Sequence, residues 1–269
     1  SIAFRMSGIV PRTGEITIAG QHALCDPRGA LFLPDLSLLV VSDLHLEKGS
    51  AAARRGNLLP PYDTGATLDR LAAVIDDLRP ATVLSLGDSF HDDGGAGRMP
   101  GFYREKLLAL MSGREWVWVT GNHDPQAPVG LPGIVAEEIA IGSLRFRHEP
   151  LAGAQAGEIA GHLHPGAMVI QRGRAVRRRC FAADGDRLIM PAFGAFTGSL
   201  NVLDRAYQGL FRWERFIAHM LGNARVYAVQ VVACGWAETS AAQTSLQAAF
   251  FIGLSRTGMR TDTMVPTFS

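Results

Sequence analysis

Three apolar segments that each end in metal-binding types of residue constrain the fold of this chain most strongly. The segments 38–41, 82–86 and 116–119 are followed by Ser42-Asp43-Leu44-His45, Gly87-Asp88 and Gly121-Asn122-His123-Asp124. Apolar runs of this length are typical of buried β-strands. Positions i and i+2 of an extended chain lie on one side, so the spacing predicts that Asp43 and His45 converge at the end of their strand.

Helical patterns separate these three strands. A helix is expected to begin at Asp63 or Thr64 and to end before Pro80, with its apolar residues on one face. A second helix is expected over 102–111. Strands that alternate with helices predict a parallel sheet, and ligands gather at the carboxyl ends of such strands. The polar residues at the three strand ends are therefore expected to form one site.

The chain becomes richer in β-structure after Asp124. The segments 134–141 and 144–148, joined at Gly142-Ser143, predict a hairpin. Further strands are predicted at 15–18, 30–33, 158–162, 167–171, 175–181 and 187–190. The second half also supplies His148, His162 and His164, of which the last two again lie two residues apart. An α/β half followed by a β-rich half indicates a second sheet that packs on the first.

Composition limits the possible classes of function. Hydrophobic residues make up 47% of the 269 residues, which is ample for a core. The formal net charge is +1, so any site for a polyanion must be a local patch. The three cysteines form neither a zinc ribbon nor a disulfide framework, which favours a reducing compartment. Without a signal-peptide pattern or a membrane-length apolar run, we expect a soluble, cytoplasmic protein.

The order of the motifs resembles that of a known family. Asp43-x-His45, Gly87-Asp88, Gly121-Asn122-His123-Asp124, His148 and Gly161-His162-x-His164 are similar to the motifs of the calcineurin-like metallophosphoesterases. Stretches 46–49, 58–63, 87–92 and 190–194 further resemble the ligase-associated DNA-damage-response phosphoesterases, the PdeM family. The resemblance implies a four-layer α-β-β-α sandwich, an α/β fold with two mixed sheets face to face and helices outside. We expect that domain at 1–233 and a C-terminal extension at 234–269, which is helical in part or poorly ordered.

The same resemblance implies a centre with two divalent metal ions. One ion would be held by Asp43, His45 and His164, the other by Asn122, His148 and His162, with Asp88 as the bridge. Nitrogen and oxygen ligands without thiolates suit Mn²⁺ first, with Fe and Zn²⁺ as alternatives. A hydroxide bridging the metals would attack phosphorus. His123 would act as the general acid for the leaving oxygen, and Asp124 would orient a neighbour or support the loop.

His91 bears on the class of substrate. The protein phosphatases of the superfamily carry an aspartate three residues after the Gly-Asp acid, whereas this chain carries His91, as the double-strand-break-repair nucleases do. A second imidazole beside His123 would add a hydrogen-bond donor without adding negative charge. We therefore predict a phosphodiesterase. The resemblance to the PdeM family implies that it is a DNA nuclease in repair, with a DNA ligase and a helicase as partners. A phosphomonoesterase or small-nucleotide hydrolase is the alternative enzyme, and a non-catalytic binding scaffold is the alternative of another class.

Basic residues are the candidates for substrate contacts. Lys48, Arg54 and Arg55 follow the first motif and either contact phosphate or form a solvated loop. A second basic run consists of Arg172, Arg174, Arg177, Arg178 and Arg179. This run either follows a nucleic-acid backbone or covers a solvated edge strand. In a strand, Arg177 and Arg179 would point to one side and Arg178 to the other.

Overall fold

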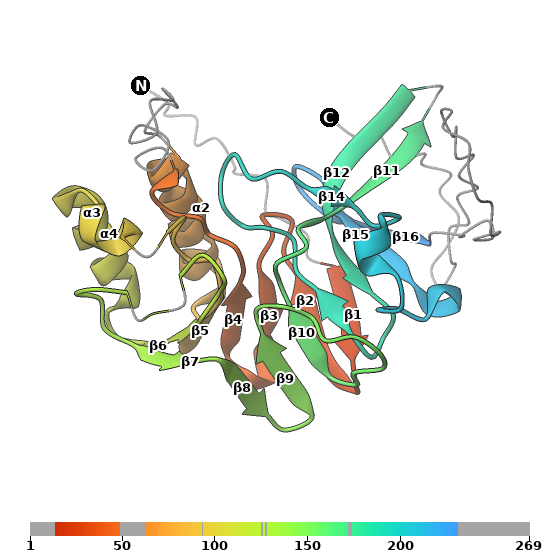
Figure 1. The fold of residues 1–269 in the computed structure, drawn as a ribbon, viewed down its shortest axis with the longest axis horizontal. Coiled ribbons are helices and arrows are strands. Elements are labelled where there is room, and N and C mark those ends of the chain that lie inside the picture. The colour runs from red at the N-terminus through yellow and green to blue at the C-terminus, as the bar shows by residue number, and fades with distance from the viewer. Residues whose placement is uncertain are drawn as a thin grey trace, which may run out of the picture.

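Two mixed β-sheets lie face to face in the computed structural model of the protein (Figure 1). The structure describes residues 14–48, 63–92, 94–124, 126, 128–171 and 174–230. The first sheet has the order β1-β2-β3-β4-β5-β6-β7. Its strands are β1 Gly14–Ile18, β2 Gln21–Cys25, β3 Leu31–Leu33, β4 Leu38–Val41, β5 Thr82–Leu86, β6 Glu115–Val119 and β7 Ile134–Ala136. Strands β4 to β7 run parallel, as the alternation of strands and helices predicts.

The second sheet has the order β14-β11-β12-β13-β10-β9-β8, with β15 paired to β12 and β16 paired to β15. Its first strands are β8 Glu138–Ile141, β9 Leu144–Arg147, β10 Glu158–Ala160, β11 Pro165–Gln171 and β12 Arg174–Ala183. The remaining strands are β13 Leu188–Ile189, β14 Leu200–Asn201, β15 Ile217–Leu221 and β16 Val226–Gln230. The mixed sheets confirm the predicted fold class.

Three helices cover the outer face of the first sheet: α2 Asp63–Leu78, α3 Gly95–Arg98 and α4 Gly101–Met111 (Figure 1). Alternation along the strands divides the apolar residues between two cores. Leu38 and Val40 face the second sheet, whereas Leu39 and Val41 face the helices. Trp116 and Trp118 are buried on the helix side, as expected of core residues.

The outer face of the second sheet is covered differently. Aromatic side chains from 200–216, among them Tyr207, Phe211 and Phe216, pack on it. In the described part of the chain, the regular elements of this layer are single-turn 3-10 helices, η2 Arg205–Tyr207 and η3 Trp213–Arg215, rather than α-helices. A third such turn, η1 Pro34–Leu36, precedes β4.

One predicted strand is divided between the sheets. The expected strand 134–141 consists of β7, which pairs with β6, and β8, which forms the predicted hairpin with β9. The chain passes from one sheet to the other at Glu137. Strand β2 was not predicted from the sequence, because its polar first residues Gln21 and His22 interrupt the apolar pattern.

The predicted boundary between 1–233 and 234–269 falls outside the described residues. Within them, no helix has both the length and the apolar character needed to cross a membrane.

Candidate metal centre

The loops that follow β4 and β5 run side by side and hold the first acidic residues of the site. His45 N donates to Asp88 O at 2.9 Å, and Leu46 N donates to Ser89 O at 2.9 Å. In return, His91 N donates to Leu46 O at 3.0 Å. The parallel pairing of the two strands thus continues into the loops, which fixes Asp43 and His45 relative to Asp88 and His91.

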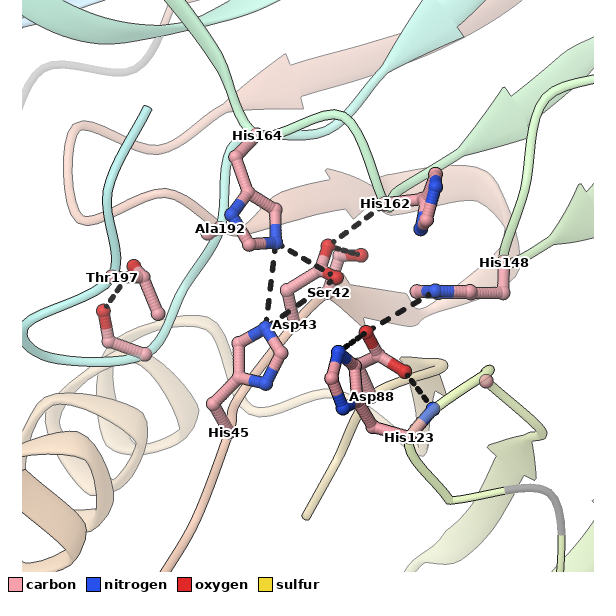
Figure 2. A network of polar contacts seen from close by, with 12 residues as sticks. Ser42, Asp43, His45, Asp88, His123, His148, His162, His164, Ala192 and Thr197 are labelled. Atoms are coloured by element: carbon pink, nitrogen blue, oxygen red, sulfur yellow. Dashed lines mark hydrogen bonds and ion pairs between the residues drawn. The ribbon is translucent and has the colours of Figure 1, made fainter. Parts of the chain in front are cut away.

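One group of potential ligands contains Asp43, His45 and His164, whose ligand atoms all lie within 4.8 Å of one another (Figure 2). Asp43 Oδ1 is 3.1 Å from His164 Nε2 and 4.0 Å from His45 Nε2. The hydroxyl of Ser42 donates to Asp43 Oδ2 at 2.6 Å and orients the carboxylate. A polar hydrogen bond of this kind fixes a ligand's geometry before a metal binds.

A second group contains Asp88, His148 and His162 (Figure 2). His148 Nε2 is 3.4 Å from Asp88 Oδ2 and 2.8 Å from Asn122 Oδ1. The other ring nitrogen of His148, Nδ1, lies 3.1 Å from Leu86 O. A hydrogen bond from Nδ1 to that carbonyl orients the ring, so that Nε2, which faces Asn122 and Asp88, would bind a metal after losing its proton. The structure therefore brings all seven predicted ligands together.

The ligands lie on loops whose backbone is left-handed, which corrects the expected geometry. Asp43, His45, Asp88, His162 and His164 all have φ between 45° and 67°. Residues two apart therefore converge through left-handed turns, not through an extended strand. Left-handed backbone at non-glycine residues costs free energy and concentrates at functional sites.

Glycines in the motifs leave room for the ligands. A Cβ on Gly87 would lie 2.2 Å from His148 Nδ1, one on Gly121 2.3 Å from Asp88 Oδ1, and one on Gly161 1.9 Å from Ser42 Oγ. Even a methyl group in place of a glycine Hα at these three positions would displace a ligand or the residue that orients it. The glycines are visible in the sequence, but the side chain that packs against each of them is known only from the structure.

Gly161→Ala is expected to lower metal affinity at the Asp43 group. The methyl group would displace Ser42 and the Asp43 carboxylate, whose Oδ2 would be 2.8 Å from it. Losing an orienting partner of a ligand typically costs about 10- to 100-fold in metal affinity. The measurement is a metal titration by calorimetry, with Gly97→Ala as the matched control, because a Cβ on Gly97 meets nothing within 4 Å. Equal affinities of the two variants would contradict the assignment.

The electrostatics of the centre favour cations. Burial disfavours ionisation of Asp88, but the contact with His148 outweighs it and lowers the Asp88 pKa to about 2. Burial likewise disfavours ionisation of Asp43, yet the interaction with His164 leaves its pKa lowered. Burial lowers the His45 pKa to about 4, so that this imidazole is neutral at neutral pH. Burial disfavours the charged form of His148, but Asp88 and Asp43 together raise the His148 pKa to about 9. A divalent metal requires a neutral imidazole, so its binding at His148 would displace a proton.

The buried atoms of the first group fit a metal ion. Asp43 is fully buried, and no group at the described positions donates a well-formed hydrogen bond to its Oδ1. That oxygen instead faces the ring nitrogens of His45 and His164. An ionised oxygen buried without such a donor is costly unless a cation neutralises it. The donor set contains oxygen and nitrogen only, which suits Mn²⁺, Fe or Zn²⁺.

His123 and His91 lie next to the ligands on the open side of the centre. Their rings stack with centroids 5.7 Å apart, and the His45 ring is 5.6 Å from that of His123 and 6.1 Å from that of His91. His123 Nε2 is 3.9 Å from Asp88 Oδ2, and 47% of the His123 side chain is exposed. His123 is thus open to solvent where a substrate can approach, and the part-buried His91 ring stacks beside it.

Asp124 connects the ends of β5 and β6. Its Oδ2 accepts hydrogen bonds from Ser89 N at 2.7 Å and Phe90 N at 3.1 Å, and its Oδ1 accepts one from Gly121 N at 3.2 Å. Burial is the main cause that raises the Asp124 pKa, to about 7. Through these contacts Asp124 holds the loops that follow β5 and β6 together.

Among the basic candidates, Lys48 lies beside the centre and donates to Phe196 O at 3.1 Å. Arg54 and Arg55 lie outside the described residues, as does Arg172. Among the strands that the structure describes, residues 174–179 of β12 pair only with β11, so this part of β12 lies at an edge of the described sheet. Arg177 and Arg179 both reach the segment 192–199, which agrees with the predicted alternation.

Fold and site together define a metal-dependent phosphoester hydrolase. The family model for calcineurin-like phosphoesterases matches residues 36–179, and the chain belongs to that family. The crystal structure of Pseudomonas putida nuclease MPE is similar, with a TM-score of 0.62 and 26% identity over 81% of this chain and 100% of that chain. This likeness is consistent with the resemblance to the PdeM phosphoesterases.

A phosphoesterase from E. coli, Yfce, is a more distant match, with a TM-score of 0.37 and 17% identity over 72% of this chain and 98% of that chain. No significant match was found among curated proteins.

Proposed function

We propose that the protein is a phosphodiesterase that cleaves DNA and uses two divalent metal ions, with Mn²⁺ preferred. The observation that carries this proposal is the stacked pair His91 and His123 beside the two ligand groups. A phosphodiester carries one negative charge and two ester oxygens, and two imidazoles offer it donors without electrostatic repulsion. The nuclease among the similar structures supports the same substrate class.

Each part of the site has a proposed role. Asp43, His45 and His164 would hold one ion, and Asn122, His148 and His162 would hold the other. Asp88 would contribute its carboxylate to both. When bound, such a pair of ions activates water and stabilises the charge on the phosphoryl oxygens. His123 protonates the leaving oxygen, and His91 donates a hydrogen bond to a non-bridging oxygen. Asp124 holds the loops that carry these groups.

Wild-type protein with Mn²⁺ is expected to hydrolyse an aryl phosphodiester faster than the matching aryl monoester. Both substrates release the same phenol, so the ratio of their kcat/KM values reports the preference directly. A preference for the monoester would contradict the proposal and leave a phosphomonoesterase. Activity on neither, in protein that contains metal, would favour the non-catalytic scaffold.

His91→Asp tests the proposed contact. A carboxylate in place of the imidazole would repel the phosphodiester and remove a donor, so we expect kcat/KM for the diester to fall about 10- to 100-fold, the range of a charged hydrogen bond. His22→Asp, on the exposed part of β2, is the matched control. An unchanged diester rate in His91→Asp would remove His91 from substrate binding.

A role in DNA repair, a DNA ligase and a helicase as partners, and a cytoplasmic location belong to the proposal as well. The repair role and the two partners rest on the resemblance to the PdeM family, whereas the location rests on the cysteine pattern. Their test is co-purification of the tagged protein with those enzymes from its native cells.

A further inference from the structure

The segment 192–199 lies directly against the first ligand loop. Phe193 N donates to Ser42 O at 2.8 Å, and Gly194 N donates to Asp43 O at 3.1 Å. A Cβ on Gly194 would lie 2.3 Å from Leu44 O, so the two backbones are in close contact. Figure 2 shows Ala192 and Thr197 on the side of the centre formed by His45 and His164.

Basic side chains converge on the carbonyl groups of this segment. Arg179 donates to Ala192 O at 2.5 Å, Arg70 to Phe193 O at 2.7 Å and Lys48 to Phe196 O at 3.1 Å. Arg177 donates to Ser199 O. No carboxylate in the described ranges forms an ion pair with any of the four, although other arginines of the protein have such partners.

The concentration of positive charge here is costly to the folded protein. Burial lowers the Arg179 pKa to about 10, with a further contribution from the nearby Arg70. Burial also lowers the Arg70 pKa. Like charges held together without an anion are destabilising, and an anionic ligand would relieve the repulsion. This surface adjoins the ligand loop of the candidate metal centre, so a phosphate of the substrate would be the complementary anion.

Phe196 gives the segment a second property. Its side chain is 74% exposed, and its backbone is left-handed with φ 58°. A bulky residue rarely adopts that conformation, because it strains the backbone. The Phe196 side chain buries too little surface to compensate for this strain. The exposed ring and the Lys48 ammonium group, which binds the Phe196 carbonyl, thus lie at one loop. Proteins combine aromatic rings and basic groups in this way to stack bases while they bind phosphates.

We propose that the segment 192–199 binds the nucleoside next to the scissile phosphate, with the base stacked on Phe196 and the adjoining phosphate near Lys48 and Arg177. The inference rests on the proposed phosphodiesterase function and names the part of the substrate that the protein recognises. The ligand class is a nucleoside phosphodiester, in contrast to a simple alkyl or aryl diester.

The test compares two substrates with the same leaving group, thymidine 5′-(4-nitrophenyl phosphate) and methyl 4-nitrophenyl phosphate. Both release 4-nitrophenol, and only the first carries a base. Wild-type protein with Mn²⁺ is expected to favour the nucleoside ester. In Phe196→Ala, the ratio of the two kcat/KM values is expected to fall about tenfold, within the range for one stacked base. Phe196→Trp is expected to restore the ratio.

Phe102→Ala is the matched control, because Phe102 on α4 is also a largely exposed phenylalanine, with 64% of its surface exposed. A ratio that stays within about twofold of wild type in Phe196→Ala, or one that falls equally in Phe102→Ala, would overturn the inference. Failure of the wild-type protein to hydrolyse either diester would instead overturn the proposed function, so the two failures are distinct.

Discussion

Asp88→Ala is expected to abolish both metal binding and phosphoester hydrolysis. Asp88 follows β5 and is almost completely buried. Its Oδ2 lies 3.4 Å from His148 Nε2 and 3.9 Å from His123 Nε2, and its Oδ1 accepts a hydrogen bond from His123 N at 3.0 Å. The substitution would remove the carboxylate that we propose both ions would share, and would leave their mutual repulsion without compensation.

Metal content after dialysis, measured by elemental analysis, is the readout for this variant. Asp92→Ala is the matched control, because Asp92 lies in the same loop but pairs with Arg98. Circular dichroism of both variants verifies that they fold. Two ions per chain in folded Asp88→Ala would disprove the bridging position, whatever the activity.

His123→Ala is expected to keep its metal ions and to lose turnover by a factor of about 10² to 10⁴, the usual contribution of a general acid. Metal retention follows from the contacts, because the link from His123 to the centre includes a backbone N–H, which alanine preserves. Slow turnover in this variant has two possible causes, the loss of the general acid or a distortion of the site. A separate measurement is needed to distinguish them.

The dependence on the leaving group separates them. An alkoxide such as the sugar oxygen of a dinucleotide needs a proton as it departs, whereas 4-nitrophenolate does not. The loss in His123→Ala is therefore expected to be much larger for a dinucleotide than for a 4-nitrophenyl diester, while distortion would slow both equally. Full activity toward the dinucleotide would exclude His123 as the acid.

The sequence predicted much of the site because parallel strands end at one edge of a sheet. Asp43, Asp88 and Asn122 each follow a buried strand, and β4, β5 and β6 are parallel neighbours. The period of two in these strands also predicts which residues face which core. Alternation along β12 anticipated that Arg177 and Arg179 share a side.

The rest depends on contacts between segments that are distant in the sequence. The left-handed backbone of Asp43 and His45 arises from the hydrogen bonds between two loops, and no local pattern indicates it. The passage of the chain between sheets at Glu137 depends on pairing partners that an apolar run does not specify. Arg70 and Phe196 were not predicted as site residues, because they come from a helix and a loop that carry no ligand.

The most direct test of the two-metal account is a titration of metal-free protein with Mn²⁺ while hydrolysis of an aryl diester is followed. At a protein concentration far above the metal Kd, activity is expected to rise to a plateau at two equivalents per chain. A plateau at one equivalent, or full hydrolysis without added metal, would contradict a centre in which both ligand groups hold an ion.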